Sequence, residues 1–354
     1  MISIDTFFDN NIKRISEEYK TPYELTQRAI YALGLVEALR KVGLDFVFKG
    51  GSSMMLLFET PKRLSTDVDI LVSPDCDIDS YVKKASAMFP FVSYEESIRK
   101  TSKTISKKHF KFHYKSPNSD RTFTILLDVL FSNNNYAKTL DVPLKNNFLI
   151  DDGKGLLLVK IPTPESLLGD KLTAFAPHTT GINFFNEDFS NDKRLEVVKQ
   201  FYDVATLFDI CHDFKEVKRT YLNIVKEEIE YRGGKYSIDE CLMDSFNSAL
   251  SILSLGKFSN EDYRNYVEGF KKISEHIVGI RLNPNNAYLP AAKAMLLSAC
   301  ILKDVDPFAL DINQTNLIEN PPYNRINRLI KVQPEAFNIA AIAIDMMLNA
   351  SLKE

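Results

Sequence analysis

The spacing of hydrophobic residues near the start of the chain changes from a helical period to a strand period. Apolar residues recur every three or four positions over residues 21–42, which predicts an amphipathic helix that ends at Gly43. Residues 46–48 predict a short strand, and the glycine pair at positions 50 and 51 predicts a turn after it. Ser52 stands where an N-cap belongs, so we expect a short helix next.

A second strand is predicted where the sequence reads DVDILV, because apolar and polar positions alternate there. Asp67 and Asp69 are two positions apart, so both side chains should point to the same side of this strand. Further strands are expected over residues 91–95, 109–115, 122–131 and 156–161. The third of these reads TFTILLDVLF and places Asp128 inside an otherwise apolar run, where burial without a partner would be costly.

The second half of the chain has a helical pattern almost throughout. Thr163 as N-cap and Pro164 as the first helical residue predict a helix that carries Lys171. Residues 177–192 are polar and predict a mobile loop, and the following helix carries Lys199 and Asp203 on one face. We therefore expect an α+β fold, with a first domain over residues 1–162 that contains a mixed sheet flanked by helices and an all-helical domain over residues 163–354.

Composition narrows the class of protein but does not identify a ligand. The 354 residues are 45% hydrophobic and 26% charged, as in ordinary globular proteins, and the net charge of −3 provides no general attraction for nucleic acid. The first residues lack the apolar run of a signal peptide, and no apolar stretch reaches the ~18 residues of a membrane span, so we expect a cytoplasmic protein without a membrane partner. The cysteines lack metal or redox spacing and are expected to be free thiols: Cys76, Cys211, Cys241 and Cys300.

The paired aspartates suit the chemistry of nucleotidyl transfer. Hard divalent cations prefer carboxylate oxygens, and two acids at positions i and i+2 of a strand have side chains about 7 Å apart on one side. Asp128 is the candidate for a third metal ligand. It also fits a simpler interpretation, an acid at the end of a strand without a role in metal binding. A glycine turn leading into a helix lets backbone N–H groups approach phosphate oxygens, and the Ser52 hydroxyl could add to this attraction.

These motifs resemble the AbiEii/AbiGii toxin family of the DNA polymerase β-like nucleotidyltransferase superfamily. The family pattern of a GG[ST]-x-x-L helix followed by an R-x-[ST]-x-D-x-D strand is matched here by Gly50, Gly51, Ser52, Leu56, Arg63, Ser65, Asp67 and Asp69. A later lysine motif reads DKLTA with Lys171, and a K-D-x-x-D-L motif reads KQFYDV. Gln200 replaces the first aspartate of that last motif, so only Asp203 can take its role.

The resemblance implies a role for each matching residue. Asp67, Asp69 and Asp128 would bind Mg²⁺ or Mn²⁺, and Asp128 would help to deprotonate the acceptor. Lys171 and Asp203 of the helical domain would join the active-site cleft. Lys171 would contact the triphosphate of the NTP, and Asp203 would orient Lys171 or the incoming nucleotide. The phosphates would be held by Gly51 and Ser52, with help from Arg63 and Ser65; Arg63 equally fits a loop residue paired to an acid.

Several of these residues also have a simpler interpretation. Lys199 and Asp203 fit an i, i+4 surface ion pair, and Lys171 fits a helix-surface lysine. The strand KHFKFHYK has an apolar and a basic face, which fits either a nucleic-acid contact or a solvated sheet face. Neighbouring basic residues make this the densest positive region of the chain: Arg99, Lys100, Lys103, Lys107 and Lys108. His178 and His212 lack partners at ligand spacing and are expected to be structural.

The function implied by the resemblance is that of a toxin enzyme. Such a protein would transfer a nucleotide from an NTP to an acceptor such as the 3′ end of tRNA, release pyrophosphate and block translation. Its antitoxin would be a separately encoded protein. Two alternatives remain open at this point: an inactive nucleotide-binding or interaction protein on the same scaffold, and an antibiotic-modifying nucleotidyltransferase, which the basic strand makes less attractive because a cationic drug needs an acidic pocket.

Overall fold

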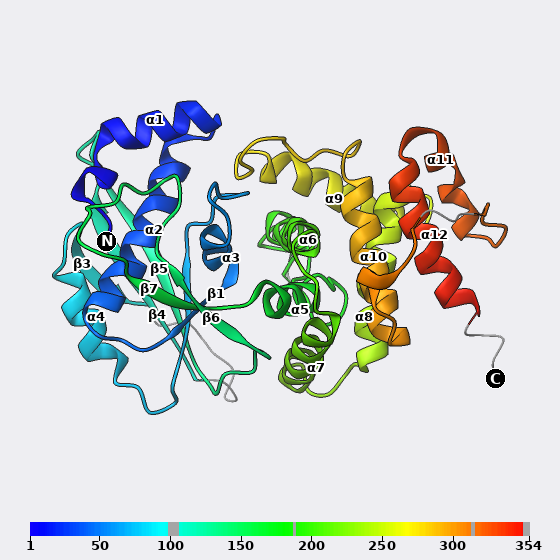
Figure 1. Cartoon of the computed structure of the whole chain (residues 1–354), viewed down its shortest axis with the longest axis horizontal. Coiled ribbons are helices and arrows are strands. Elements are labelled where there is room, and N and C mark those ends of the chain that lie inside the picture. The colour runs from blue at the N-terminus through cyan, green and yellow to red at the C-terminus, as the bar shows by residue number, and fades with distance from the viewer. Residues whose placement is uncertain (98–105, 187–188, 313–315, 350–354) are drawn as a thin grey trace. The chain divides into compact units, whose positions relative to one another are not determined.

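The computed structural model describes the chain except for residues 98–105, 187–188, 313–315 and 350–354. The chain forms two compact units (Figure 1). The first comprises Met1–Thr163 together with Glu275–Arg281, and the second comprises Pro164–Ser274 together with Leu282–Glu354. A short segment from the second half of the sequence therefore returns to the first unit, which the sequence pattern does not indicate.

A mixed five-stranded sheet forms the centre of the first unit. Its strands, in spatial order, are β1 (Val47–Lys49), β2 (Val68–Val72), β5 (Thr122–Phe131), β4 (Lys107–Lys115) and β3 (Phe91–Glu96). Strands β2 and β5 run parallel, whereas the other neighbouring pairs are antiparallel. A separate antiparallel pair is formed by β6 (Thr139–Pro143) and β7 (Leu158–Pro162). The α+β class with a mixed sheet is thus confirmed.

Helices α2 (Tyr23–Lys41) and α4 (Ile78–Ser86) cover one face of this sheet (Figure 1). Alternate residues of β4, Phe110, Phe112 and Tyr114, are fully buried beneath them, and the ring of Tyr114 stacks on Tyr31 with centroids 3.8 Å apart. The intervening residues of β4 and β5 are only partly buried. Because strand side chains alternate between faces, the polar residues of the DVDILV and TILLDVLF segments lie on the opposite, more open face.

Short helical elements precede the sheet and follow its first strand in the sequence. The chain begins with a 3₁₀ turn, η1 (Ile4–Phe7), and α1 (Asp9–Tyr19), and the glycine turn after β1 continues as α3 (Gly50–Ser53) and η2 (Met54–Leu56). The segment Glu275–Arg281, called the returning segment below, makes backbone hydrogen bonds to the loop before β2. Leu64 N–H donates to the His276 carbonyl at 2.7 Å, and Val278 N–H donates to the Lys62 carbonyl at 3.0 Å. The returning segment is therefore hydrogen-bonded to this loop.

The described part of the second unit is helical. Its α-helices are α5 (Pro164–Ala174), α6 (Arg194–Phe208), α7 (Phe214–Tyr231), α8 (Ile238–Leu253), α9 (Asn260–Ile273), α10 (Tyr288–Lys303), α11 (Leu329–Val332) and α12 (Pro334–Asn349), with the 3₁₀ turns η3 (Pro307–Ala309) and η4 (Tyr323–Arg328). Helix α10 is buried over most of its length and packs against α6, α8 and α12, so it forms the centre of this unit.

Most of the elements expected from the sequence are present, with one correction, and the structure adds α1, α4 and β6, which were not expected. Ser52 is not an N-cap: it lies inside α3, and Lys49 occupies the capping position without a side-chain hydrogen bond. Strand β6 is not predicted by the hydrophobic pattern, because its residues are all partly or fully exposed and it pairs with β7 alone. Helix α5 begins at Pro164, as expected from the position of that proline.

The cysteines are all free, as expected, and three of them are buried. Burial raises the pKa of the Cys300 thiol to about 12 and also raises that of Cys211, so both are protonated at neutral pH. Within the described residues, no helix combines the length and the apolar character needed to cross a membrane.

Gly169 provides a test of the packing of α5 against α7. A Cβ at this position would lie 2.7 Å from the Val217 carbonyl oxygen and 2.8 Å from the Tyr221 backbone nitrogen, and neither backbone atom can move away without shifting a helix. We expect Gly169→Ala to destabilise the protein by about 1–3 kcal/mol through overpacking. The measurement is chemical denaturation followed by circular dichroism. At a helix position with free space the same change would stabilise by about 0.5–1 kcal/mol, so a stabilised variant would contradict this packing.

Candidate active site

The parallel pairing of β2 with β5 brings two of the expected metal ligands side by side. Asp69 and Asp128 are partners in the strand register, and neighbouring strands are about 4.8 Å apart. Their preceding neighbours, Val68 and Leu127, are also partners and are fully buried on the covered face. Both carboxylates therefore occupy the open face of the sheet. Lys49 of β1 is the register partner of Asp69 on its other side, which places a cation there that the motif does not include.

Asp67 lies immediately before β2, two residues from Asp69. Its carboxylate accepts a hydrogen bond from the Thr66 hydroxyl at 3.4 Å. Its backbone carbonyl accepts a second hydrogen bond from the Ser52 hydroxyl. The glycine turn and the start of β2, separate in sequence, are thus joined at this aspartate.

Both glycines of the turn are required by what packs against them. Gly50 has φ +74°, a conformation that side chains other than glycine rarely adopt, and a Cβ there would overlap Asp69 Oδ2. A Cβ on Gly51 would overlap the guanidinium of Arg63. The GG pair therefore allows an acid and a base to approach the turn backbone closely, a consequence of tertiary packing that the motif alone does not reveal.

The other residues expected at the phosphates are placed as follows. The Ser52 side chain is fully buried, and its hydroxyl holds the turn to β2. Arg63 is 6% exposed and donates to the Leu64 carbonyl at 3.2 Å, beside the returning segment. Ser65 is partly buried in the same loop. In this arrangement the Ser52 hydroxyl and the Arg63 guanidinium both donate to backbone carbonyls of the segment that leads into β2.

His109 is a residue of this site that the sequence reasoning missed. It is the register partner of Asp128 in β4, and its Nδ1 lies 2.7 Å from Asp128 Oδ1. The imidazole is largely buried, with 12% of the side chain exposed. The alternation of KHFKFHYK indicated which face His109 occupies, but only the register of β4 against β5 shows that it supports the aspartate. Asp128 is accommodated in an apolar strand because its side chain lies on the open face, 34% exposed, and pairs with His109.

The donor chemistry of the three aspartates fits a hard divalent cation, and the register fits a shared site for two of them. With the side chains as they stand, however, the described residues contain no group of three or more His, Cys, Asp or Glu side chains that could hold a metal ion. The Asp128 carboxylate is hydrogen-bonded to His109 and the Asp67 carboxylate to Thr66. The backbone thus places Asp69 and Asp128 side by side, with Asp67 two residues before Asp69.

In the second unit, Lys171 and Asp203 form a buried ion pair between α5 and α6. Lys171 Nζ lies 3.1 Å from Asp203 Oδ2, and the two side chains are 7% and 0% exposed. Lys171 Nζ also donates to Gln200 Oε1 at 3.1 Å. The simpler interpretations of a surface lysine and a surface ion pair are therefore wrong for both residues. Gln200, which departs from the motif, keeps an oxygen on the lysine without the second negative charge.

The remaining candidate residues have local partners. Two lysines of the basic strand are neutralised: Lys108 pairs with Asp79 and Lys111 with Glu95. This weakens the case for the basic strand as a nucleic-acid contact; Arg99, Lys100 and Lys103 lie outside the described residues. His178 Nε2 pairs with Asp262 at 3.1 Å, which raises the pKa of the imidazole. The backbone N–H of His212 donates to Glu165.

Comparison of the sequence with models of known protein families assigns the chain to a family. Residues 35–281, more than half of the chain, match the family model described as nucleotidyl transferase AbiEii toxin of a type IV toxin–antitoxin system. The chain belongs to the AbiEii family of nucleotidyltransferase toxins. It is therefore a nucleotidyltransferase, and the family's partner is a separate antitoxin. The match ends at the last residue of the returning segment, Arg281, so the AbiEii match includes the segment that braces the loop before β2.

Solved structures show more distant similarity to this AbiEii chain. JHP933 from Helicobacter pylori is 12% identical with a TM-score of 0.43, covering 79% of this chain and 94% of its own. A candidate nucleotidyltransferase from H. pylori is 12% identical with a TM-score of 0.45, covering 80% and 99%. An antigenic nucleotidyltransferase-like protein from Paracoccidioides brasiliensis is 14% identical with a TM-score of 0.36, covering 58% and 90%. No curated protein matches the sequence.

The buried pair in the second unit leads to a stability prediction. Lys171→Met leaves Asp203 fully buried without its cation, so we expect a loss of about 3–5 kcal/mol in the free energy of unfolding. Lys171→Met combined with Asp203→Leu removes both charges and should recover most of that loss. Chemical denaturation of the two variants measures this difference. Equal losses in the single and double variants would show that the charge pair is not the cause.

Proposed function

We propose that this AbiEii protein is a metal-dependent nucleotidyltransferase that transfers a nucleotide from an NTP to an acceptor hydroxyl, with Asp67, Asp69 and Asp128 as the cation ligands. The adjacent register of Asp69 and Asp128, beside a glycine turn that contacts Asp69, is the observation that carries the proposal. When bound, Mg²⁺ or Mn²⁺ would neutralise the triphosphate and activate the attacking hydroxyl.

The chain's own residues have defined parts in this reaction. The acceptor oxygen forms a bond to the α-phosphorus, the bond to the pyrophosphate oxygen breaks, and the proton of the acceptor passes to Asp128. We assign the phosphates to backbone N–H groups of the glycine turn, at Gly50 and Gly51, because N–H groups at the start of a helix attract anions. His109 hydrogen-bonds to Asp128 and restricts the orientation of its carboxylate.

The biological setting follows the family. We propose that the protein acts in the cytoplasm on the 3′ end of tRNA, that translation stops as a result, and that its separately encoded antitoxin prevents this. The family's place in a toxin–antitoxin system supports the proposal. The same assay also tests the two other acceptor classes, a protein and an aminoglycoside.

The experiment that tests the proposal incubates the full-length protein with each labelled NTP, Mg²⁺ and either total tRNA, total protein or an aminoglycoside. We expect label to enter tRNA, and we expect Asp67→Asn and Asp69→Asn each to lower the rate by at least about a hundredfold, since each removes an anionic ligand. Omission of Mg²⁺ with added EDTA should abolish transfer.

Three outcomes contradict parts of this proposal. Label that enters only the protein or the aminoglycoside rules out tRNA as the acceptor. Equal transfer by the wild type and both asparagine variants removes the aspartates from the mechanism. Transfer that persists in EDTA shows that no divalent cation is needed. Circular dichroism of the variants controls for unfolding.

His109 and His113 provide a matched pair of variants on the same strand face. His109 is hydrogen-bonded to Asp128, whereas His113 Nδ1 lies 3.1 Å from the hydroxyl of Thr124. We expect His109→Ala to lower the transfer rate about 10- to 100-fold and to raise the Mg²⁺ concentration needed for half-maximal rate. His113→Ala should change neither quantity by more than about twofold. If both variants respond alike, His109 has no particular role in orienting Asp128.

A further inference from the structure

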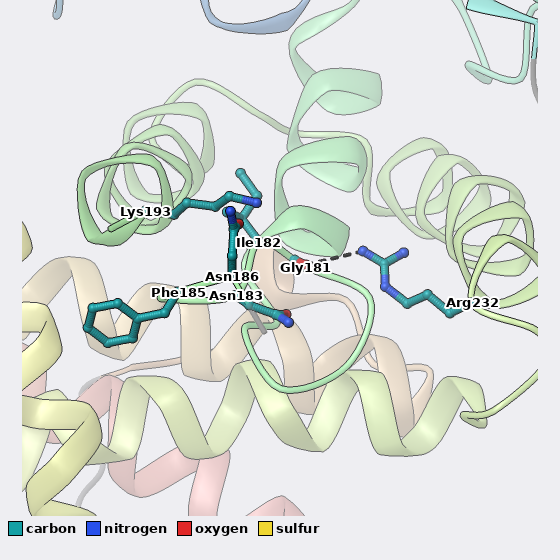
Figure 2. A pocket seen from close by; sticks show the side chains of 7 residues that line it. All are labelled: Gly181, Ile182, Asn183, Phe185, Asn186, Lys193 and Arg232. Atoms are coloured by element: carbon teal, nitrogen blue, oxygen red, sulfur yellow. Dashed lines mark hydrogen bonds between the residues drawn. The ribbon is translucent and has the colours of Figure 1, made fainter. Parts of the chain in front are cut away.

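The second unit contains a pocket of about 660 Å³ that the proposed chemistry does not use (Figure 2). It is lined by Gly181, Ile182, Asn183, Phe185, Asn186, Lys193 and Arg232. All of these residues belong to the unit that does not contain Asp69 and Asp128. A volume of this size is within the range of pockets for small organic ligands and exceeds what a bare inorganic ion would fill.

Among the lining residues that the structure describes, the charged side chains are two cations, Lys193 and Arg232. Figure 2 shows Lys193 and Arg232 extending from opposite sides toward the backbone of Gly181 and Ile182. Lys193 directly precedes α6, and Arg232 directly follows α7. Arg232 is paired with Glu228, so the net positive charge of the described lining residues comes from Lys193, and this charge favours an anionic ligand.

No acid among the described residues compensates the charge of Lys193. Its neighbour Asp192 is bound to Arg194 and Lys272 instead, and the hydrogen bond from Arg194 holds the pKa of that carboxyl well below its usual range. Lys193 is also held in place by its backbone N–H, which donates to the Phe184 carbonyl at 2.8 Å. A cation at a helix N-terminus is electrostatically unfavourable, so stability of α6 does not explain this lysine.

Arg232 is anchored but retains donors. Its guanidinium donates to the Gly181 carbonyl at 3.1 Å, to the Glu228 carbonyl at 3.1 Å and to the Glu228 carboxylate. A guanidinium has five N–H donors, so these three hydrogen bonds leave two. Glu228 offsets part of the Arg232 charge, and Lys193 supplies the remaining positive charge of the pocket. The amides of Asn183 and Asn186 add uncharged donors and acceptors.

We propose that this pocket binds an organic phosphate, with its phosphate group between Lys193 and Arg232. A phosphate has several acceptor oxygens and can accept from an ammonium and a guanidinium at once. The asparagine amides then lie where they can hydrogen-bond the rest of the ligand. The phosphate belongs either to a mononucleotide or to a single-stranded nucleic acid, and this binding does not depend on nucleotidyl transfer.

Direct binding to the full-length protein tests the proposal. The Asp67→Asn, Asp69→Asn double variant in EDTA serves as the background, so that binding at the three aspartates does not contribute. The probes are a short labelled single-stranded RNA, AMP and inorganic phosphate, measured by fluorescence anisotropy or calorimetry. Lys193→Gln is the test variant because its structural hydrogen bond is made by the backbone. Lys226→Gln is the control, since it removes the same charge from an exposed position on α7.

We expect Lys193→Gln to raise the Kd of RNA or AMP about threefold to tenfold, and inorganic phosphate to compete. For RNA, the slope of log Kd against log salt should fall by about 0.7, the contribution of one phosphate contact on a single strand. Lys226→Gln should change Kd by less than about twofold. Binding of RNA without AMP assigns the pocket to a strand, and binding of AMP assigns it to a nucleotide. The proposal is overturned if no probe binds or if Lys193→Gln has no larger effect than Lys226→Gln.

Discussion

The parallel pairing of β2 with β5 is the constraint on which the candidate active site depends. A parallel pair fixes which residues are neighbours, and a shift of one position would move Asp69 or Asp128 to the covered face of the sheet. The buried neighbours Val68 and Leu127 oppose such a shift, because it would expose them to water. The hydrophobic core beneath the sheet therefore determines where the two carboxylates lie.

The strand register places the aspartates, and contacts with neighbouring residues then restrict their positions. The turn after β1 contacts Asp69 through Gly50, and the Ser52 hydroxyl joins this turn to Asp67. On the other side His109 holds Asp128. The proposed catalytic aspartates thus lie on or next to strands and have neighbours that restrict them, which suits a reaction that depends on positioning and electrostatics.

The second unit shows how a departure from a family motif can be accommodated. Lys171 is buried with Asp203 as its ionic partner, and Gln200 provides a second oxygen at the same distance. An aspartate at position 200 would place two carboxylates on one buried lysine, whereas glutamine gives one positive and one negative charge. The substitution therefore leaves a balanced buried pair.

Local patterns in the sequence were sufficient to predict most strands, a helical second half and the α+β class, and to single out the acids at positions 67, 69 and 128 as candidate ligands, because side-chain periodicity and residue type are local properties. The tertiary structure alone decided which of these residues meet. It placed Asp69 beside Asp128, paired Asp128 with His109, and brought residues 275–281 back to the loop before β2. It also made Ser52 a tether instead of a helix cap. These contacts depend on strand register and on segments distant in sequence, which residue spacing does not encode.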